Sequence, residues 1–292
     1  MQEAGKFKGY LFITAAAALW GMIGPFARLA FAEGVLPMEV AFWRAVLAWG
    51  FFGSHAAMLR EVRMQPRDWP ALLVFALTGV ALFYGSYQLA VKSGGAALAS
   101  VLLYTAPAWV VVLARIFLKE VLTPVKLVAL ALTLAGIAGV SLGGAGDSGA
   151  GLTVSVGALI AGLTAGFCYS LYYIFGKHFS NRYSSPNLFF YMLPIGAVCL
   201  FPLVEFSHKT PTAWAALICI AFFSTYGAYY CYYIGLKQME ASRASITATL
   251  EPVVAAVVAY FWWGETFTLM GYIGSALILG AVILMVLDGL RQ

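Results

Sequence analysis

Charged residues are scarce in this chain of 292 residues, since Asp, Glu, Lys and Arg together make up 10% of it. A soluble domain carries about 25%. Hydrophobic residues make up 62%, and the mean hydropathy is +0.88. A chain with so few charges cannot cover its apolar side chains for water. The composition therefore excludes a soluble globular protein and predicts an integral membrane protein.

Residues that build metal sites, disulfides or enzyme active sites are also few. The three histidines lie near the ends of apolar segments, and neither an HExxH motif nor a pair of aspartates occurs. The cysteines lie in apolar segments without metal-ligand spacing, so we interpret them as small hydrophobic residues; they are Cys168, Cys199, Cys219 and Cys231. The sequence predicts no metal, no cofactor and no enzymatic activity.

Long polar segments are absent as well, which leaves no room for a soluble domain. Apolar runs of about 20 residues recur instead, the length that crosses a hydrocarbon core of roughly 30 Å as a helix. We therefore predict an all-α integral membrane protein with ten spans. They cover residues 9–31, 38–58, 69–91, 96–117, 124–143, 152–177, 185–205, 211–235, 243–263 and 268–287.

The second half of the chain repeats the first at an offset of 145 residues. Tyr87 falls on Tyr232, and Glu120 falls on Glu265. Toward the N-terminus of each half, the match continues when the offset is increased by four residues. Each half holds five spans, and an odd number makes the second half enter the membrane from the opposite side. We predict two inverted five-helix repeats, residues 1–146 and 147–292, that form one compact membrane domain.

The distribution of Lys and Arg predicts the orientation. Thirteen of them lie on the side of the N-terminus, whereas Arg28, Lys92 and Lys209 lie on the other side. By the positive-inside rule, both termini and residues 60–68 are cytoplasmic, and residues 143–151 face outward. This bias accounts for the net charge of +5, so we expect the lipid bilayer and not nucleic acid as a partner.

The N-terminus has a competing interpretation as a cleaved signal peptide. Lys6 and Lys8 precede an apolar run that ends in residues 30–32, Ala-Phe-Ala, which resembles a signal-peptidase site. The run is long for a signal peptide, contains Pro25 and Arg28, and has a repeat partner in the sixth span. We therefore expect it to be retained as the first membrane helix.

Two ionisable residues lie inside spans, where hydrocarbon penalises charge. Arg44 in the second span is a candidate for a substrate carboxylate or a gate, and Glu251 in the ninth for an amine or a proton. Alternatively, Arg44 extends to the interface and Glu251 satisfies neighbouring polar groups. The repeat pair Pro107 and Pro252 lies mid-span, and we expect a kink at each that acts as a hinge or as a static bend.

Many aromatic residues lie inside spans and not at the headgroup level. In the eighth span, Tyr226 is followed by Tyr229, Tyr230 and Tyr233 at helical spacing. Such a stripe indicates either simple packing or the wall of a cavity that is rich in hydroxyl groups. For the cavity we predict the wall residues Trp20, Tyr84, Tyr87, Gln88, Tyr104, Tyr169, Tyr173, Tyr229, Tyr230 and Tyr233, together with Arg44 and Glu251.

Three segments carry a resemblance to a known family: residues 250–256, LEPVVAA, with 264–266, GET; their degenerate copy from Pro107 to Glu120; and residues 42–44, FWR. Together they resemble the ten-helix EamA branch of the drug/metabolite transporter superfamily. The likeness covers the whole chain. Within that branch, the chain is similar to the bacterial inner-membrane exporters of aromatic amino acids, the YddG type.

The resemblance implies a basket of ten helices around a central cavity, and uncoupled or proton-linked efflux of amino acids. It assigns the family's second-span arginine to Arg44 and its Glu-Pro pair to Glu251 and Pro252. Ala106 stands where the first half would carry that glutamate, so any role of Glu251 is asymmetric. We expect Glu120 and Glu265 to cap helix ends.

Three function classes remain: a solute carrier, a channel and an intramembrane enzyme. A channel needs a continuous charged or carbonyl-lined pore, which a single Arg and a single Glu do not supply. Inverted repeats and a polar, aromatic interior favour the carrier. We expect it to export aromatic amino acids, with methionine as a further candidate. Another small metabolite or drug is the alternative substrate. Ten helices suffice for one pathway in a monomer.

Overall fold

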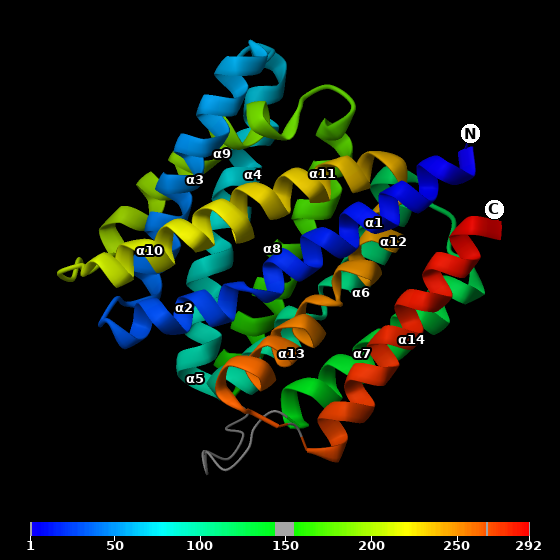
Figure 1. Cartoon of the computed structure of the whole chain (residues 1–292). Helices are drawn as coiled ribbons and strands as arrows, with labels where there is room; N and C mark the ends of the chain where they lie inside the picture. The colour runs from blue at the N-terminus through cyan, green and yellow to red at the C-terminus, as the bar shows by residue number, and fades with distance from the viewer. Residues whose placement is uncertain (1, 144–154, 267, 292) are drawn as a thin grey trace.

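The computed structural model describes residues 2–143, 155–266 and 268–291, and it is helical without a strand in these ranges (Figure 1). The first half comprises α1 (Gln2–Gly21), α2 (Ile23–Ala32), α3 (Pro37–Leu59), η1 (Pro66–Asp68), α4 (Trp69–Ala76), η2 (Leu77–Leu82), α5 (Phe83–Leu103), α6 (Ala106–Leu113), η3 (Ala114–Leu118) and α7 (Pro124–Gly143). The second half comprises α8 (Val156–Ser180), α9 (Ser185–Leu200), η4 (Phe201–Leu203), α10 (Pro211–Cys219), η5 (Ile220–Gly227), α11 (Ala228–Gln238), α12 (Ala241–Ala248), α13 (Glu251–Trp263) and α14 (Leu269–Arg291).

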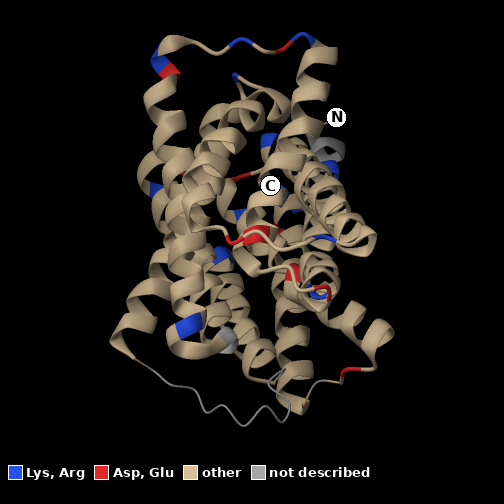
Figure 2. Ribbon diagram, turned by 90° about the vertical axis from the view of Figure 1, so that its left-hand side faces the viewer, with Lys and Arg blue, Asp and Glu red and all other residues tan. Residues whose placement is uncertain are grey.

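These elements form the ten membrane helices that the sequence predicts. Nine helices in the described ranges are long and apolar enough to cross a membrane. The tenth is α3, which has 23 residues and carries Glu39, Arg44 and His55. Charged residues are sparse along the helices (Figure 2). The two termini lie at the same end of the bundle in both views, as an even number of crossings requires. The predicted fold class is confirmed.

The two halves are interleaved, so that each membrane helix packs against a helix of the other half. Helix α1 packs on α11 and α5 packs on α8, which pairs the first span of each half with the third span of the other. Helix α3 packs on α9, and α7 packs on α14 (Figure 1). Ile13 and Trp20 of α1 are buried in these contacts, which fits a retained first helix and not a cleaved signal peptide.

Glycines let α7 and α14 approach until their backbones touch. A Cβ atom on Gly139 would lie 2.9 Å from the Cα of Gly274, and one on Gly274 would lie 2.5 Å from the carbonyl oxygen of Gly136. Both distances are shorter than any normal contact of a Cβ. Small residues at this crossing are therefore a condition of the fifth and tenth membrane helices packing together.

The structure corrects the interpretation of the two prolines. We expected Pro107 and Pro252 to kink continuous helices, but each lies in the first turn of a new helix, α6 or α13. The residues between α5 and α6, and between α12 and α13, form turns. Proline has no N–H to donate, and the first turn of a helix needs no such donor from it. The fourth and ninth membrane helices are therefore each two helices joined by a turn.

Three π-helical segments, η2, η3 and η5, were not predicted from the sequence. Single π-turns within α-helices are frequently found at functional sites. Of the three, η2 falls inside η5 when the repeat offset of 145 residues is applied. These two segments interrupt the third membrane helix of each half at equivalent positions.

The glycine crossing generates a prediction with a matched control on the same helix. Gly274→Leu should separate α7 from α14 and lower the thermal stability of the purified protein in detergent, at a cost of about 1–3 kcal/mol or more. Gly280→Leu is the control, because nothing lies within 4 Å of a Cβ built on Gly280. Thermal unfolding measured for both variants checks this. Equal unfolding temperatures would contradict the close packing.

Candidate functional site

A cavity of 260 Å³ lies between helices of both halves. Nine of the twelve residues that we predicted for the wall of a cavity line it. They are Trp20, Arg44, Tyr84, Tyr87, Gln88, Tyr104, Tyr169, Tyr229 and Glu251. The structure thus brings together residues that lie up to 231 positions apart in the sequence, from seven of the ten membrane helices, α3 among them.

Arg44 is held in place by the π-helical segment η5. Its Nε donates a hydrogen bond to Oγ1 of Thr225 at 2.7 Å, and a terminal nitrogen lies 3.5 Å from the carbonyl oxygen of Ser224. Thr225 in turn donates to the carbonyl oxygen of Ile220, five residues earlier, at 3.2 Å. These contacts use only part of the guanidinium, which carries five N–H donors. The group faces the cavity with donors to spare.

The same contact recurs in the other half with a different donor. The hydroxyl of Tyr172 donates a hydrogen bond to the carbonyl oxygen of Gly79 at 2.7 Å. Gly79 lies in η2 and is the repeat equivalent of Ser224. In both halves, a carbonyl in the π-helical segment accepts from a side chain of the opposite half. Neither contact is predictable from the sequence, because each uses a backbone carbonyl that a regular α-helix would hydrogen-bond to one of its own N–H groups.

Glu251 lies at the first position of α13, where the helix dipole favours a negative charge. The hydroxyl of Tyr169 lies 3.5 Å from its Oε2. The backbone of Glu251 is packed against the first membrane helix, because a Cβ on Gly21 would lie 2.9 Å from the Glu251 carbonyl oxygen. No ion pair within the described residues joins Glu251 to Arg44. The cavity therefore contains one basic and one acidic side chain that form no direct ion pair with each other.

Aromatic rings surround the two charged residues. The rings of Trp20 and Tyr229 meet edge to face with centroids 5.4 Å apart. On the opposite wall, Phe83 stacks on Tyr169 at 5.8 Å with an interplanar angle of 24°. Tyr84 is the repeat equivalent of Tyr229, so the two halves contribute matching rings. Phe83 was missed in the sequence, although it precedes the predicted Tyr84 and Tyr87 on the same helix.

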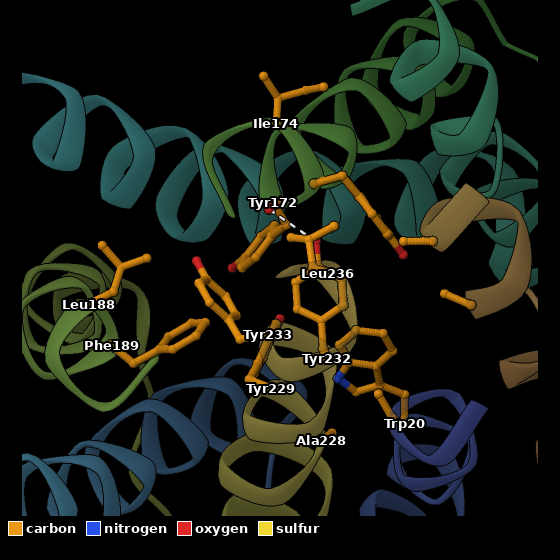
Figure 3. Packing of buried hydrophobic residues seen from close by; sticks show 14 of the residues in the cluster. Trp20, Tyr172, Ile174, Leu188, Phe189, Ala228, Tyr229, Tyr232, Tyr233 and Leu236 are labelled. Atoms are coloured by element: carbon orange, nitrogen blue, oxygen red, sulfur yellow. Dashed lines mark hydrogen bonds between the residues drawn. The ribbon is translucent and has the colours of Figure 1, made fainter. Parts of the chain in front are cut away.

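Three predicted residues do not line this cavity. Tyr230 is 37% exposed, with its ring 5.3 Å from that of His55. Tyr233 is 2% exposed and packs on Phe189, and its hydroxyl has no hydrogen-bond partner (Figure 3). Tyr173 is buried beside a void of 10 Å³ and not in the main cavity.

The helical period explains where the tyrosine stripe divides. Residues at i, i+3, i+4 and i+7 cover a face about 100° wide. Tyr229 and Tyr233 lie on one flank of it and point into the bundle, with Tyr172 and Trp20 nearby (Figure 3). Tyr226 and Tyr230 lie on the other flank and face His55 on α3.

The cavity extends toward one end of the bundle. Its lining includes Phe31 at the end of α2 and Pro37 at the start of α3, and Arg28 lies on α2 one turn before Phe31. Toward the opposite end, the rings of Tyr173 and Tyr232 pack edge to face at 5.3 Å. The cavity thus reaches the end of the bundle that carries Arg28 and is blocked toward the other end.

Proteins that resemble this chain in sequence are named as transporters. The model of the EamA-like transporter family matches the chain twice, at residues 7–142 and 156–287. An uncharacterized transporter of Archaeoglobus fulgidus is 30% identical over 279 residues, which cover 93% of this chain and 94% of that protein. The uncharacterized inner membrane transporter YicL of Salmonella typhimurium is 25% identical over 295 residues, 98% of this chain and 97% of that protein.

A solved crystal structure shares the fold, with a TM-score of 0.81 at 20% identity over 98% of this chain and 99% of the other. The shared fold agrees with the helical membrane architecture, and the family and the relatives favour transport over catalysis. The chain is a multi-pass membrane transporter that belongs to the EamA-like transporter family.

Proposed function

We propose that the protein exports aromatic amino acids across a bacterial inner membrane, as the YddG-type exporters do. One observation carries the proposal: Arg44 and Glu251 line the same cavity, form no ion pair with each other, and share its wall with aromatic rings. An amino acid carries a carboxylate, an ammonium group and a side chain on one carbon atom. Arg44 binds the carboxylate, Glu251 binds the ammonium group, and the aromatic rings contact the side chain.

The size of the cavity favours a small solute. At 260 Å³ it is smaller than the sites of drug-sized ligands, which occupy about 300–1,000 Å³. A cationic drug would satisfy Glu251 but would bring a second positive charge near Arg44, which is costly in a low dielectric. A zwitterion compensates both residues. Another small metabolite is the second candidate, and it would need to carry both charges as well.

We further propose that transport proceeds by alternating access and that both termini are cytoplasmic. Inverted repeats provide two nearly equivalent conformations, one open to each side. The units that exchange these conformations are the halves 1–146 and 147–292, within a monomer. With the termini in the cytoplasm, the cavity that reaches Phe31 and Pro37 is open to the outside.

Ligands that lack one charge test the two ionic roles separately. Arg44→Gln should weaken phenylalanine binding about tenfold to a hundredfold, because a hydrogen bond between charged groups contributes about 1.5–3 kcal/mol. It should leave 2-phenylethylamine, which has no carboxylate, almost unaffected. Glu251→Gln should weaken phenylalanine similarly and spare 3-phenylpropionate, which has no ammonium group. Titration calorimetry with purified protein measures both.

Lys92→Gln is the control for these variants, since it removes an exposed positive charge away from the cavity. If both variants lose affinity for all three ligands equally, the two residues stabilise the fold and do not recognise the carboxylate and the ammonium group of the ligand. If phenylalanine fails to bind the unaltered protein while another solute binds, the proposed substrate is wrong.

Neighbouring tyrosines on α11 test the aromatic wall. Tyr229→Leu should reduce uptake of tryptophan and phenylalanine into proteoliposomes several-fold more than uptake of methionine, because ring–ring contacts contribute about 0.5–1.5 kcal/mol each. Tyr230→Leu is the matched control, since its ring lies outside the cavity. Equal effects of the two substitutions would show that Tyr229 only packs the bundle.

The orientation predicts which reagents reach two single cysteines. In a background without the four native cysteines, Glu61→Cys should react with a membrane-impermeant maleimide only from the cytoplasmic side. Ser148→Cys should react only from the outside; Ser148 lies in residues 143–151, most of which fall outside the described ranges. Labelling of both cysteines in intact and in inverted vesicles checks this. The reverse pattern would overturn the topology.

A further inference from the structure

The corner between α11 and α12 is held by two side chains, one from α8 and one from the loop between η3 and α7. Lys177 of α8 donates hydrogen bonds of 2.7 Å to the carbonyl oxygens of Leu236 and Met239. Glu120 accepts hydrogen bonds from the amides of Ala241 and Ser242, at 2.6 and 3.2 Å, and from the Ser242 hydroxyl at 2.5 Å. The first residue binds the last carbonyls of one helix, and the second binds the first amides of the next. We call this pair the Lys177–Glu120 clamp.

Glu120 is buried in this position, with 9% of its surface exposed. Helix ends leave amides and carbonyls without intrahelical partners, and a buried corner must satisfy them by other means. The opposite charges of Lys177 and Glu120 match the two helix ends, because a cation favours the carbonyl end and an anion favours the amide end. The clamp therefore holds the α11–α12 corner at the end of the bundle that the central cavity does not reach, where Lys177 and Glu120 also line a separate recess of 720 Å³.

The repeat supplies the same two residues at the other end of the bundle. With the four-residue adjustment that applies near the N-terminus of each half, Arg28 is the equivalent of Lys177. At the offset of 145 residues, Glu265 is the equivalent of Glu120. The equivalent corner lies within α5 at Gly95, where the backbone leaves the helical conformation at φ 82° and ψ 161°. At the offset of 145 residues, the carbonyls of Leu236 and Met239 correspond to those of Val91 and Gly94. The amides of Ala241 and Ser242 correspond to those of residues 96 and 97.

At this end the two residues bind each other. Arg28 forms an ion pair with Glu265, and their side chains are 54% and 53% exposed. The guanidinium also lies 4.6 Å from the centre of the Trp263 ring. Two equivalent pairs of residues thus adopt two different arrangements: one pair holds a corner at the end that the central cavity does not reach, and at the end that the cavity reaches the other pair is bound to itself.

We propose that Arg28 and Glu265 form the gate of this end, and that the two clamps exchange during transport. In the opposite conformation, Arg28 binds the carbonyls of Val91 and Gly94, and Glu265 binds the amides of residues 96 and 97. Lys177 and Glu120 then leave the α11–α12 corner and pair with each other. Each clamp stabilises one of the two conformations, and the gate works in the same way whichever solute is carried.

The proposal predicts opposite shifts for equivalent substitutions. Glu120→Gln weakens the buried clamp in the present conformation and only an ion pair with Lys177 in the opposite one, so it should favour the conformation open at the Lys177 end. Glu265→Gln weakens an exposed ion pair with Arg28 in the present conformation, which contributes little, and the clamp in the opposite one, so it should favour the present conformation. Loss of a hydrogen bond to a charged group in one of two states changes their ratio by about tenfold.

Cysteine reactivity in detergent measures both openings without a substrate. In a background without the native cysteines, Leu103→Cys in the cavity reports the opening at the Arg28 end. Ser245→Cys, which is 1% exposed and lines the small void beside Tyr173, reports the opening at the Lys177 end. Glu120→Gln should accelerate maleimide labelling at position 245 about tenfold and slow it at 103. Glu265→Gln should slow it at 245.

Glu205→Gln serves as the control, because its exposed side chain belongs to neither clamp. Glu265 is half exposed, so its substitution leaves the fold intact even if Glu120→Gln does not, and Lys177→Met then replaces that variant. Shifts in the same direction for both clamps, or unchanged rates in folded variants, would overturn the exchange. Because no solute is present, such a result would be independent of the proposed substrate.

Discussion

Hydrocarbon offers no hydrogen-bond partner to a peptide group, so a helix that is interrupted inside a membrane must find partners in the protein. This constraint determines where the irregular parts of the bundle lie. The π-helical segments η2 and η5 free the carbonyls of Gly79 and Ser224, and side chains of the opposite half bind them. The corner between α11 and α12 has its partners in Lys177 and Glu120. Each interruption therefore ties one half of the protein to the other.

The candidate site is a consequence of these interruptions. Arg44 is fixed by Thr225, which lies in η5, and Glu251 occupies the first turn of a helix that begins only because its membrane helix is broken. A continuous ninth helix would leave Glu251 without the favourable dipole of a helix start. Arg44 and Glu251 thus both depend on backbone irregularities. The other half binds the first of these, because Arg44 contacts Thr225 and Ser224 of η5, whereas the turn before α13 is hydrogen-bonded within its own half.

Much of the fold could be predicted from the sequence, because hydrophobic length and internal repetition are properties of residue order alone. The ten helices and their inverted arrangement followed from apolar runs and from the offset of 145 residues. The prolines indicated where the helices are interrupted but not how. A proline such as Pro107 can kink a continuous helix or begin a new one, and the turn that precedes it determines which occurs. The π-turns could not be recognised in the sequence. In such a turn, the backbone hydrogen bonds shift by one residue along the helix, and tertiary contacts decide whether this happens.

The site was predictable to a similar degree. The stripe on α11 identified the face that packs inward but could not separate Tyr229 from Tyr230, because their helical positions both satisfy the same period. Glu120 and Glu265 look identical in the repeat, and the expectation that they cap helix ends holds for Glu120. Glu265 differs because the two ends of the bundle are in different states. A sequence encodes both states and cannot indicate which one a structure shows.

The central claim is that the two ends of the bundle are equivalent and open alternately. Two repeat-equivalent pairs of spin labels test it most directly: Lys92 with Thr266 at one end, and Lys237 with Val121 at the other, all exposed positions. Pulsed electron spin resonance in lipid should find two populations for each pair. Substitutions that increase the population with the short distance at one end should increase the population with the long distance at the other end. A single population at both ends, or distances that lengthen together, would contradict the account.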